Sequence, residues 1–145
     1  MNHRLNLFIL CSIVLLFACC KTKQFTPTNF EGEKISFGNF GGFTGEMDAY
    51  HLIDNGQLYQ QEGRTQVFNA VPSVDKKVAA AIFQELKDLK LDQLKFDKPG
   101  NMNFFIEYHT TSTSNKVVWS DEIKDVDPAI LVFFGKLNGL LKAKE

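Results

Sequence analysis

Apolar and polar residues alternate in several short stretches of this chain, and a period of two predicts β-strands. The clearest stretch, 47–53, is followed by Asn55-Gly56 and a second alternating stretch, 57–61. An Asn-Gly pair between two alternating stretches is a strong signal for a β-hairpin. A second pair of strands is predicted at 104–109 and 116–120, with the polar residues between them as the turn. Shorter strands are predicted at 35–37 and 66–71.

Two other segments repeat apolar residues every three or four positions, which predicts amphipathic helices. The first is 73–89, where Ser73 is expected to cap the first turn. The second starts at Asp127-Pro128, because Asp is a good N-cap and Pro needs no N–H at the first helical position. The inward faces are predicted to consist of Val78, Ile82, Leu86 and Leu89 in the first helix, and of Ile130, Phe134, Leu137 and Leu141 in the second.

This order of elements predicts an α+β fold. We expect an antiparallel sheet of about four to six strands with the two helices packed on one face. Residues 34–145 would form a single domain, since no repeat or composition break divides them.

The first 18 residues resemble a secretory signal. A positively charged start, 1–4, precedes the apolar stretch 5–17, and Leu16-Phe17-Ala18 leads directly into Cys19. This ending resembles a bacterial lipobox, in which the cysteine receives a diacylglycerol and becomes the new N-terminus after cleavage. A plain secretory signal cut near Ala18 is the alternative. A transmembrane helix is disfavoured, because the stretch is shorter than the roughly 20 residues that span a bilayer.

A lipidated Cys19 would attach the protein to a bilayer. Residues 19–33 are polar, contain Pro27 and lack periodicity, so they are interpreted as a tether between the lipid and the domain. Two or three acyl chains would make the attachment stable, since one chain gives only marginal binding. By resemblance to Gram-negative lipoproteins, the expected location is the cell envelope, on the periplasmic side of the outer membrane.

Composition excludes several functions. The formal net charge is −1, and acidic and basic residues are interspersed, which argues against a nucleic-acid partner. All three cysteines, Cys11, Cys19 and Cys20, lie in or beside the signal, so the domain is expected to hold no disulfide and no thiolate metal site. Neither His51 nor His109 stands in a metal-binding spacing, and no Gly-x-Ser-x-Gly element is present. We therefore expect no enzyme and no cofactor.

A glycine-rich segment at 38–45 is the unusual feature of the domain, and it is predicted to be a loop. Its central residues, the candidate contact site, are Phe40, Gly41, Gly42, Phe43, Thr44 and Gly45. Glycines permit positive φ and close approach of backbones. The two phenylalanines either fold back onto the core or form an exposed hydrophobic contact site, and the residues themselves leave both interpretations open.

Gly41-Gly42-Phe43-Thr44-Gly45 resembles the Gly-Gly-Phe-Ala-Gly element near the start of emfourin-like proteins. The following order of elements is also similar, and the resemblance covers about 35–142, although the lipid anchor and the Asn55-Gly56 hairpin depart from it. Emfourins are small inhibitors of thermolysin-like metalloproteases. The resemblance therefore implies an inhibitor, or a relative of one, whose partner is an envelope or secreted protease. The anchor, the lack of catalytic residues and the phenylalanine-bearing loop predict, more broadly, a non-enzymatic binding module of the cell envelope. The alternative is a structural lipoprotein that maintains the envelope.

Overall fold

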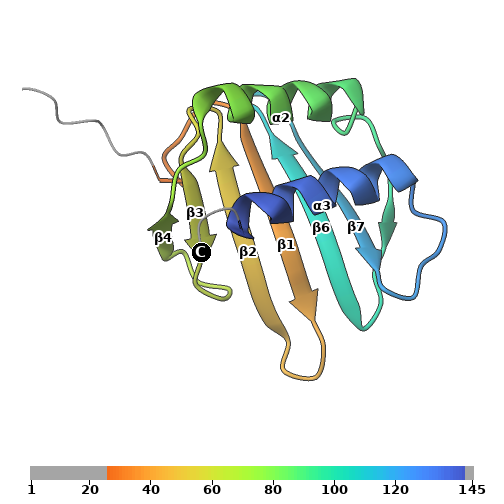
Figure 1. Cartoon of the computed structure of the whole chain (residues 1–145). Coiled ribbons are helices and arrows are strands. Elements are labelled where there is room, and N and C mark those ends of the chain that lie inside the picture. Colours follow the sequence, from red (N-terminus) through yellow and green to blue (C-terminus); the bar gives the residue numbers. More distant parts are fainter. Residues whose placement is uncertain (1–25, 143–145) are drawn as a thin grey trace, which may run out of the picture.

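Seven strands and two helices make up the described part of the chain, residues 26–142 of a computed structural model (Figure 1). The strands are β1 (Lys34–Gly41), β2 (Glu46–Ile53), β3 (Leu58–Gln61), β4 (Phe68–Val71), β5 (Asp97–Lys98), β6 (Met102–His109) and β7 (Ser114–Ser120). The helices are α2 (Lys76–Asp88) and α3 (Pro128–Lys142). The α+β class is confirmed.

All seven strands belong to one sheet in the order β4-β3-β2-β1-β6-β7-β5. The prediction of an antiparallel sheet with four to six strands is wrong on two points, because the sheet has seven strands and β5 runs parallel to β7. β5 is only two residues long, and Pro99-Gly100 follows it directly. A strand of that length has no periodicity that a sequence could show.

The Asn55-Gly56 hairpin is confirmed, with β2 and β3 paired in antiparallel register. The Asn55 side-chain oxygen accepts a bond from the backbone N–H of Gln57 at 2.9 Å. Gly56 has φ +91°, and a Cβ there would lie 2.4 Å from the carbonyl oxygen of Val74. The turn therefore needs glycine both for its backbone angle and for its contact with the segment that leads into α2.

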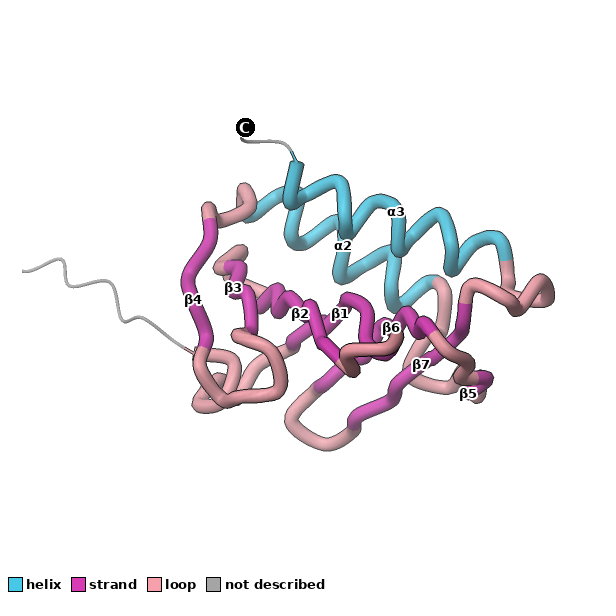
Figure 2. The backbone as a smooth tube through the Cα atoms, turned by 90° about the horizontal axis from the view of Figure 1, so that it is seen from below, coloured by secondary structure: helices cyan, strands magenta, loops and turns pink. Residues whose placement is uncertain are grey.

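The main core lies between the sheet and the helices. Figure 2 shows α2 and α3 on the same side of the strands. Inward-facing strand residues such as Phe37 and Ile106 share one buried cluster with Phe83 of α2 and Phe133 of α3. The half-buried Phe134 lies edge-on to the Trp119 ring, with 5.0 Å between ring centroids, so α3 also contacts β7 through aromatic side chains.

The helix limits correct part of the sequence analysis. The N-cap of α2 is Asp75, whose side chain accepts from Lys77 N at 2.8 Å, so the expected cap at Ser73 is wrong. The buried stripe of α2 consists of Ala79, Ile82, Phe83 and Leu86, so Val78, predicted to face inward, is instead 45% exposed. α3 begins at Pro128 as predicted, with Asp127 bonded to Ala129 N at 2.8 Å.

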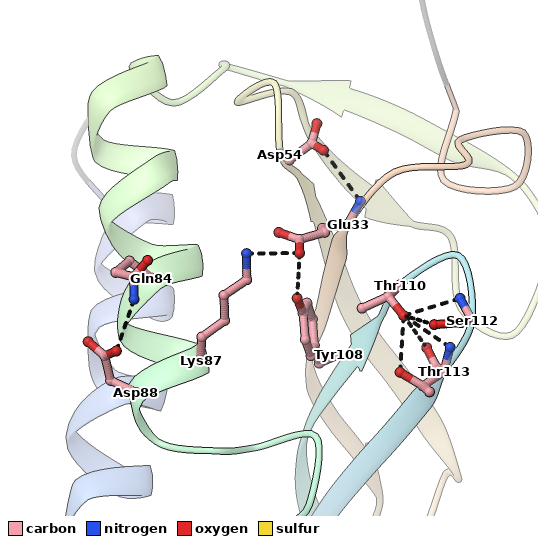
Figure 3. Close-up of polar contacts among 9 residues, drawn as sticks. All are labelled: Glu33, Asp54, Gln84, Lys87, Asp88, Tyr108, Thr110, Ser112 and Thr113. Carbon is pink, nitrogen blue, oxygen red and sulfur yellow. Dashed lines mark hydrogen bonds and ion pairs between the residues drawn. The ribbon is translucent and has the colours of Figure 1, made fainter.

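Residues 26–33, which the sequence analysis assigns to the tether, contact the domain. Glu33 is the main link, as Figure 3 shows: its Oε1 lies 2.9 Å from Lys87 Nζ in α2 and accepts from the Tyr108 hydroxyl of β6 at 2.8 Å. Partial burial alone would raise the pKa of Glu33, but these two partners outweigh it and leave that pKa lowered. The signal segment 1–18 and Cys19 lie outside the described residues. Within residues 26–142, neither helix has the length and apolar character that a membrane span requires.

Candidate contact site at the β1–β2 turn

The segment predicted as a glycine-rich loop is mostly strand. β1 continues through Gly38, Asn39 and Phe40 to Gly41, and only residues 42–45 form the turn into β2. Gly42 and Gly45 have φ of +68° and +64°, and Gly45 N donates to Gly42 O at 3.2 Å. Gly42 N also donates to Asn101 O at 2.8 Å, which fixes the turn against the residue before β6.

The glycines inside β1 are explained by close approach of neighbouring backbone. A Cβ on Gly38 would lie 2.0 Å from Asp48 O in β2. One on Gly41 would lie 2.3 Å from Asn101 O. Gly38 therefore makes room for β2 and Gly41 for the residue before β6, and glycine content alone could not separate these steric needs from those of a turn.

Phe40 is packed on the sheet face that carries no helix. It belongs to a small cluster around the buried residues Ala49, Phe105 and Val118. Its ring centroid is 6.0 Å from that of Phe105, and Lys116 Nζ lies 5.3 Å from the Phe40 centroid and 4.4 Å from the Phe105 centroid. A cation over aromatic rings is a favourable contact. Phe40 therefore follows the interpretation in which the ring folds back onto the core.

Phe43, in contrast, is exposed, as the contact-site interpretation expects. Its relative exposure is 107%, so the folded chain shields the ring no more than an extended peptide would. Beside it lies an open hollow of about 660 Å³, whose lining includes Thr44, Met47, Arg64 and Met102. An exposed aromatic ring next to flexible methionine side chains is typical of adaptable protein-binding surfaces.

The sequence did not predict the role of Asn103, whose side chain hydrogen-bonds the backbone of both β1 and the loop before β6. Asn103 of β6 is 4% exposed, and its amide donates to Gly100 O at 3.0 Å and to Phe40 O at 3.4 Å. Its side-chain oxygen accepts from Gly100 N at 2.6 Å. The amide therefore joins the loop before β6 to β1. A lone Asn at the start of a phenylalanine-rich strand gives no signal for such a role.

His51 and Ser36 form a hydrogen-bonded histidine–serine pair of the kind that can activate a nucleophile. Here, however, both side chains have their hydrogen bonds satisfied within the sheet. Gln61 donates its amide to Thr65 O at 2.7 Å, so its Oε1 accepts from His51 Nε2 at 2.9 Å. His51 Nδ1 then accepts from the Ser36 hydroxyl at 2.8 Å. Burial lowers the pKa of His51 to about 4, and both Ser36 and His51 are buried. A nucleophile needs access to its substrate, and this hydroxyl has none.

His109 ends β6 on the same face, with its Nε2 3.2 Å from Glu107 Oε1. Among residues 26–142, no three His, Cys, Asp or Glu side chains gather closely enough to hold a metal ion.

The chain matches no protein-family model and no curated protein. The resemblance to emfourin-like proteins therefore stays a prediction, based on the Gly41–Gly45 element and the order of elements.

Proposed function

We propose that this protein is a lipid-anchored, non-enzymatic binding module of the cell envelope, and that the β1–β2 turn contacts its partner. The observation that carries the proposal is the full exposure of Phe43 on a turn whose position is fixed. Two neighbours of Phe43 fix that turn, since Gly42 is bonded to Asn101 and Phe40 is packed on Phe105. A rigid turn presents an apolar ring at a low entropy cost of binding.

The location of the turn supports the proposal. β1 is the central strand, and its eight residues separate Lys34 from Gly41 by about 23 Å at the usual strand rise. Residues 26–33 lie at the first end of β1, and the turn lies at the other end (Figure 1). An anchor at Cys19 would therefore join the end of the sheet opposite to Phe43. The ring would be available to a partner in the aqueous compartment.

The most specific form of the proposal is inhibition of a thermolysin-like metalloprotease. It rests on the emfourin-like element, and Phe43 is the exposed apolar residue within that element. In this form the bilayer and an envelope or secreted protease are the two partners. The compartment that we propose is the periplasmic side of the outer membrane.

The inhibition test uses the full-length protein purified in detergent, together with a thermolysin-like protease and a peptide substrate. We expect loss of protease activity at micromolar protein, and loss of inhibition in Phe43→Ser. Val78→Ser is the matched control, because Val78 is an exposed apolar residue (45%) in α2 and lines no part of the hollow beside Phe43. Full protease activity with the wild-type protein would exclude the inhibitor form.

The alternative function is a structural lipoprotein that maintains the envelope. It shares the anchor but gives Phe43 no partner. A photoreactive group placed at Thr44 in cells distinguishes the two functions: a specific crosslinked protein that disappears with Phe43→Ser supports the binding module, and its absence supports the alternative.

A further inference from the structure

The outer face of α3 is apolar over much of its length. Leu131 and Val132 there are 45% and 59% exposed. Val132, Gly135 and Gly139 are spaced by three and four residues, so they share one side of the helix. In a surface helix this side normally carries charged residues. No other element of the described chain packs over this face.

No close contact within the described chain requires glycine at positions 135 and 139. A Cβ at either position would meet no heavy atom within 4 Å, and neither residue has a positive φ. Glycine is the least favourable residue for a helix interior after proline. The contrast with Gly38 is clear, because there a Cβ would collide with the backbone of β2. Two glycines on an exposed helical face permit another backbone to approach closely.

The charges at the two ends of α3 indicate which partner fits. Asp127 and Lys142 are both exposed and lie just before the start and at the end of the helix. Gly135 is its middle residue. A second α3 that crossed antiparallel at Gly135 would place Lys142 of each copy beside Asp127 of the other. Lys136 adds no unpaired charge near the crossing, since its Nζ lies 2.6 Å from Glu85 Oε1 of α2.

We propose that α3 is the interface of a homodimer in which two copies cross antiparallel at Gly135. Leu131 and Val132 of one copy would then pack over the Gly139 turn of the other, as a two-fold interface requires. The interface is one pair of helices, each about 22 Å long at 1.5 Å per residue, so it lies at the small end of stable interfaces. The proposal needs neither the lipid anchor nor the protease, although an anchor would favour the dimer by raising its local concentration.

The test is disulfide crosslinking of the full-length chain in its own membranes. Gly135→Cys is made in a Cys20→Ser background and exposed to a mild oxidant, and the product is run on a non-reducing gel. Close helices at this position would bring the two introduced thiols within disulfide reach. We expect a dimer band. The matched control is Gln66→Cys, an exposed position in the β3–β4 turn that should give none.

A second substitution separates specific pairing from collision. Gly139→Leu, added to Gly135→Cys, should remove the dimer band because its side chain blocks the approach of the partner. It should not lower the melting temperature of the monomer, since the position faces open space and leucine favours a helix. An equal band at positions 135 and 66, or a band that survives Gly139→Leu, would overturn the dimer.

The same thiol tests the bilayer as the other occupant of this face. A fluorophore attached at position 135 would be quenched by brominated lipids if the face lay on the membrane. Quenching without a dimer band would overturn the proposal and assign the face to the bilayer.

Discussion

His51 shows how one buried side chain makes the stability of this sheet depend on pH. Burial is the main reason why its pKa falls to about 4, and Gln61 and Glu107 only partly compensate, since nearby Lys34 and His109 lower it further. In the unfolded chain the pKa is near 6.5. Between these two values the unfolded state binds more protons than the folded state, so the free energy of unfolding decreases as the pH falls.

The first prediction follows from this sign. As the pH falls from about 6.5 to 4, protonation linked to His51 should cost about 3 kcal/mol of stability, because a pKa difference of one unit corresponds to about 1.4 kcal/mol. Urea unfolding of the wild type and of His51→Gln at several pH values measures this loss, which the variant should lack. His109→Gln, on the same face, should retain it. Parallel pH profiles for the wild type and His51→Gln would contradict the prediction.

The second prediction separates the two phenylalanines of the candidate site. Phe40→Ser should lower the free energy of unfolding by about 2 kcal/mol, because it removes a half-buried ring from Phe105 and Lys116. Phe43→Ser should change it by no more than about 0.5 kcal/mol, since the ring contributes no burial. Chemical denaturation of both variants provides the measurement. A large loss for Phe43→Ser would mean that the ring packs in solution.

At the scale of elements, β1 depends on one close contact with β2. Gly38→Ala places a Cβ 2.0 Å from Asp48 O, and neither backbone can move without breaking the pairing of the central strand. The third prediction is a loss of about 3 kcal/mol or more, or no folded protein. Gly45→Ala is the control, because its φ of +64° is strained but a Cβ there meets nothing within 4 Å. It should cost about 1 kcal/mol. Thermal melts of the two variants compare these losses, and similar melting temperatures would contradict the close-contact argument.

Periodicity in the sequence was sufficient for the elements that alternate or repeat over many residues. It predicted the β2–β3 and β6–β7 hairpins, and the Asp127-Pro128 pair, as a capping signal, gave the start of α3 at Pro128. It failed at β1, because glycine content was interpreted as a loop although Gly38 and Gly41 serve strand pairing. It also failed at Asp75 and β5, where the deciding interaction is a single cap or a two-residue pairing.

The sequence predicted the position of the candidate site but not which of its side chains are exposed. The glycine-rich sequence singled out Phe40 and Phe43 together, but it could not predict that Phe40 is packed on the sheet while Phe43 is exposed. Their difference comes from partners far away in the chain: Phe105 and Lys116 receive Phe40, and no described residue reaches far enough to cover Phe43. Such long-range contacts leave no trace in local spacing.

At the scale of the whole molecule, Glu33 joins three parts of the fold at one end of the sheet. It links the segment before β1 to α2 through Lys87 and to β6 through Tyr108 (Figure 3). Burial and the adjacent carboxylate raise the pKa of Tyr108, so this hydroxyl stays a donor at neutral pH. Through Glu33 the segment before β1 therefore contacts both a helix and the sheet, at the end opposite to Phe43.

The last prediction concerns the attachment that we propose at that end. Seven residue steps separate Cys19 from Thr26, the first described residue, so a lipid on Cys19 would hold the domain within about 25 Å of the bilayer even if these residues were fully extended. We expect mass spectrometry of the protein from its native host to find a diacylglyceryl group on Cys19 as the N-terminal residue. Cys19→Ala should move the protein from the membrane fraction to the soluble fraction or leave the signal uncut. Cys20→Ala is the matched control, since it removes the neighbouring thiol and should leave the protein in the membrane fraction. An unmodified N-terminus at or near residue 19 in the native protein would indicate plain secretion. The binding role of Phe43 would then have to be exerted by a free, diffusing domain.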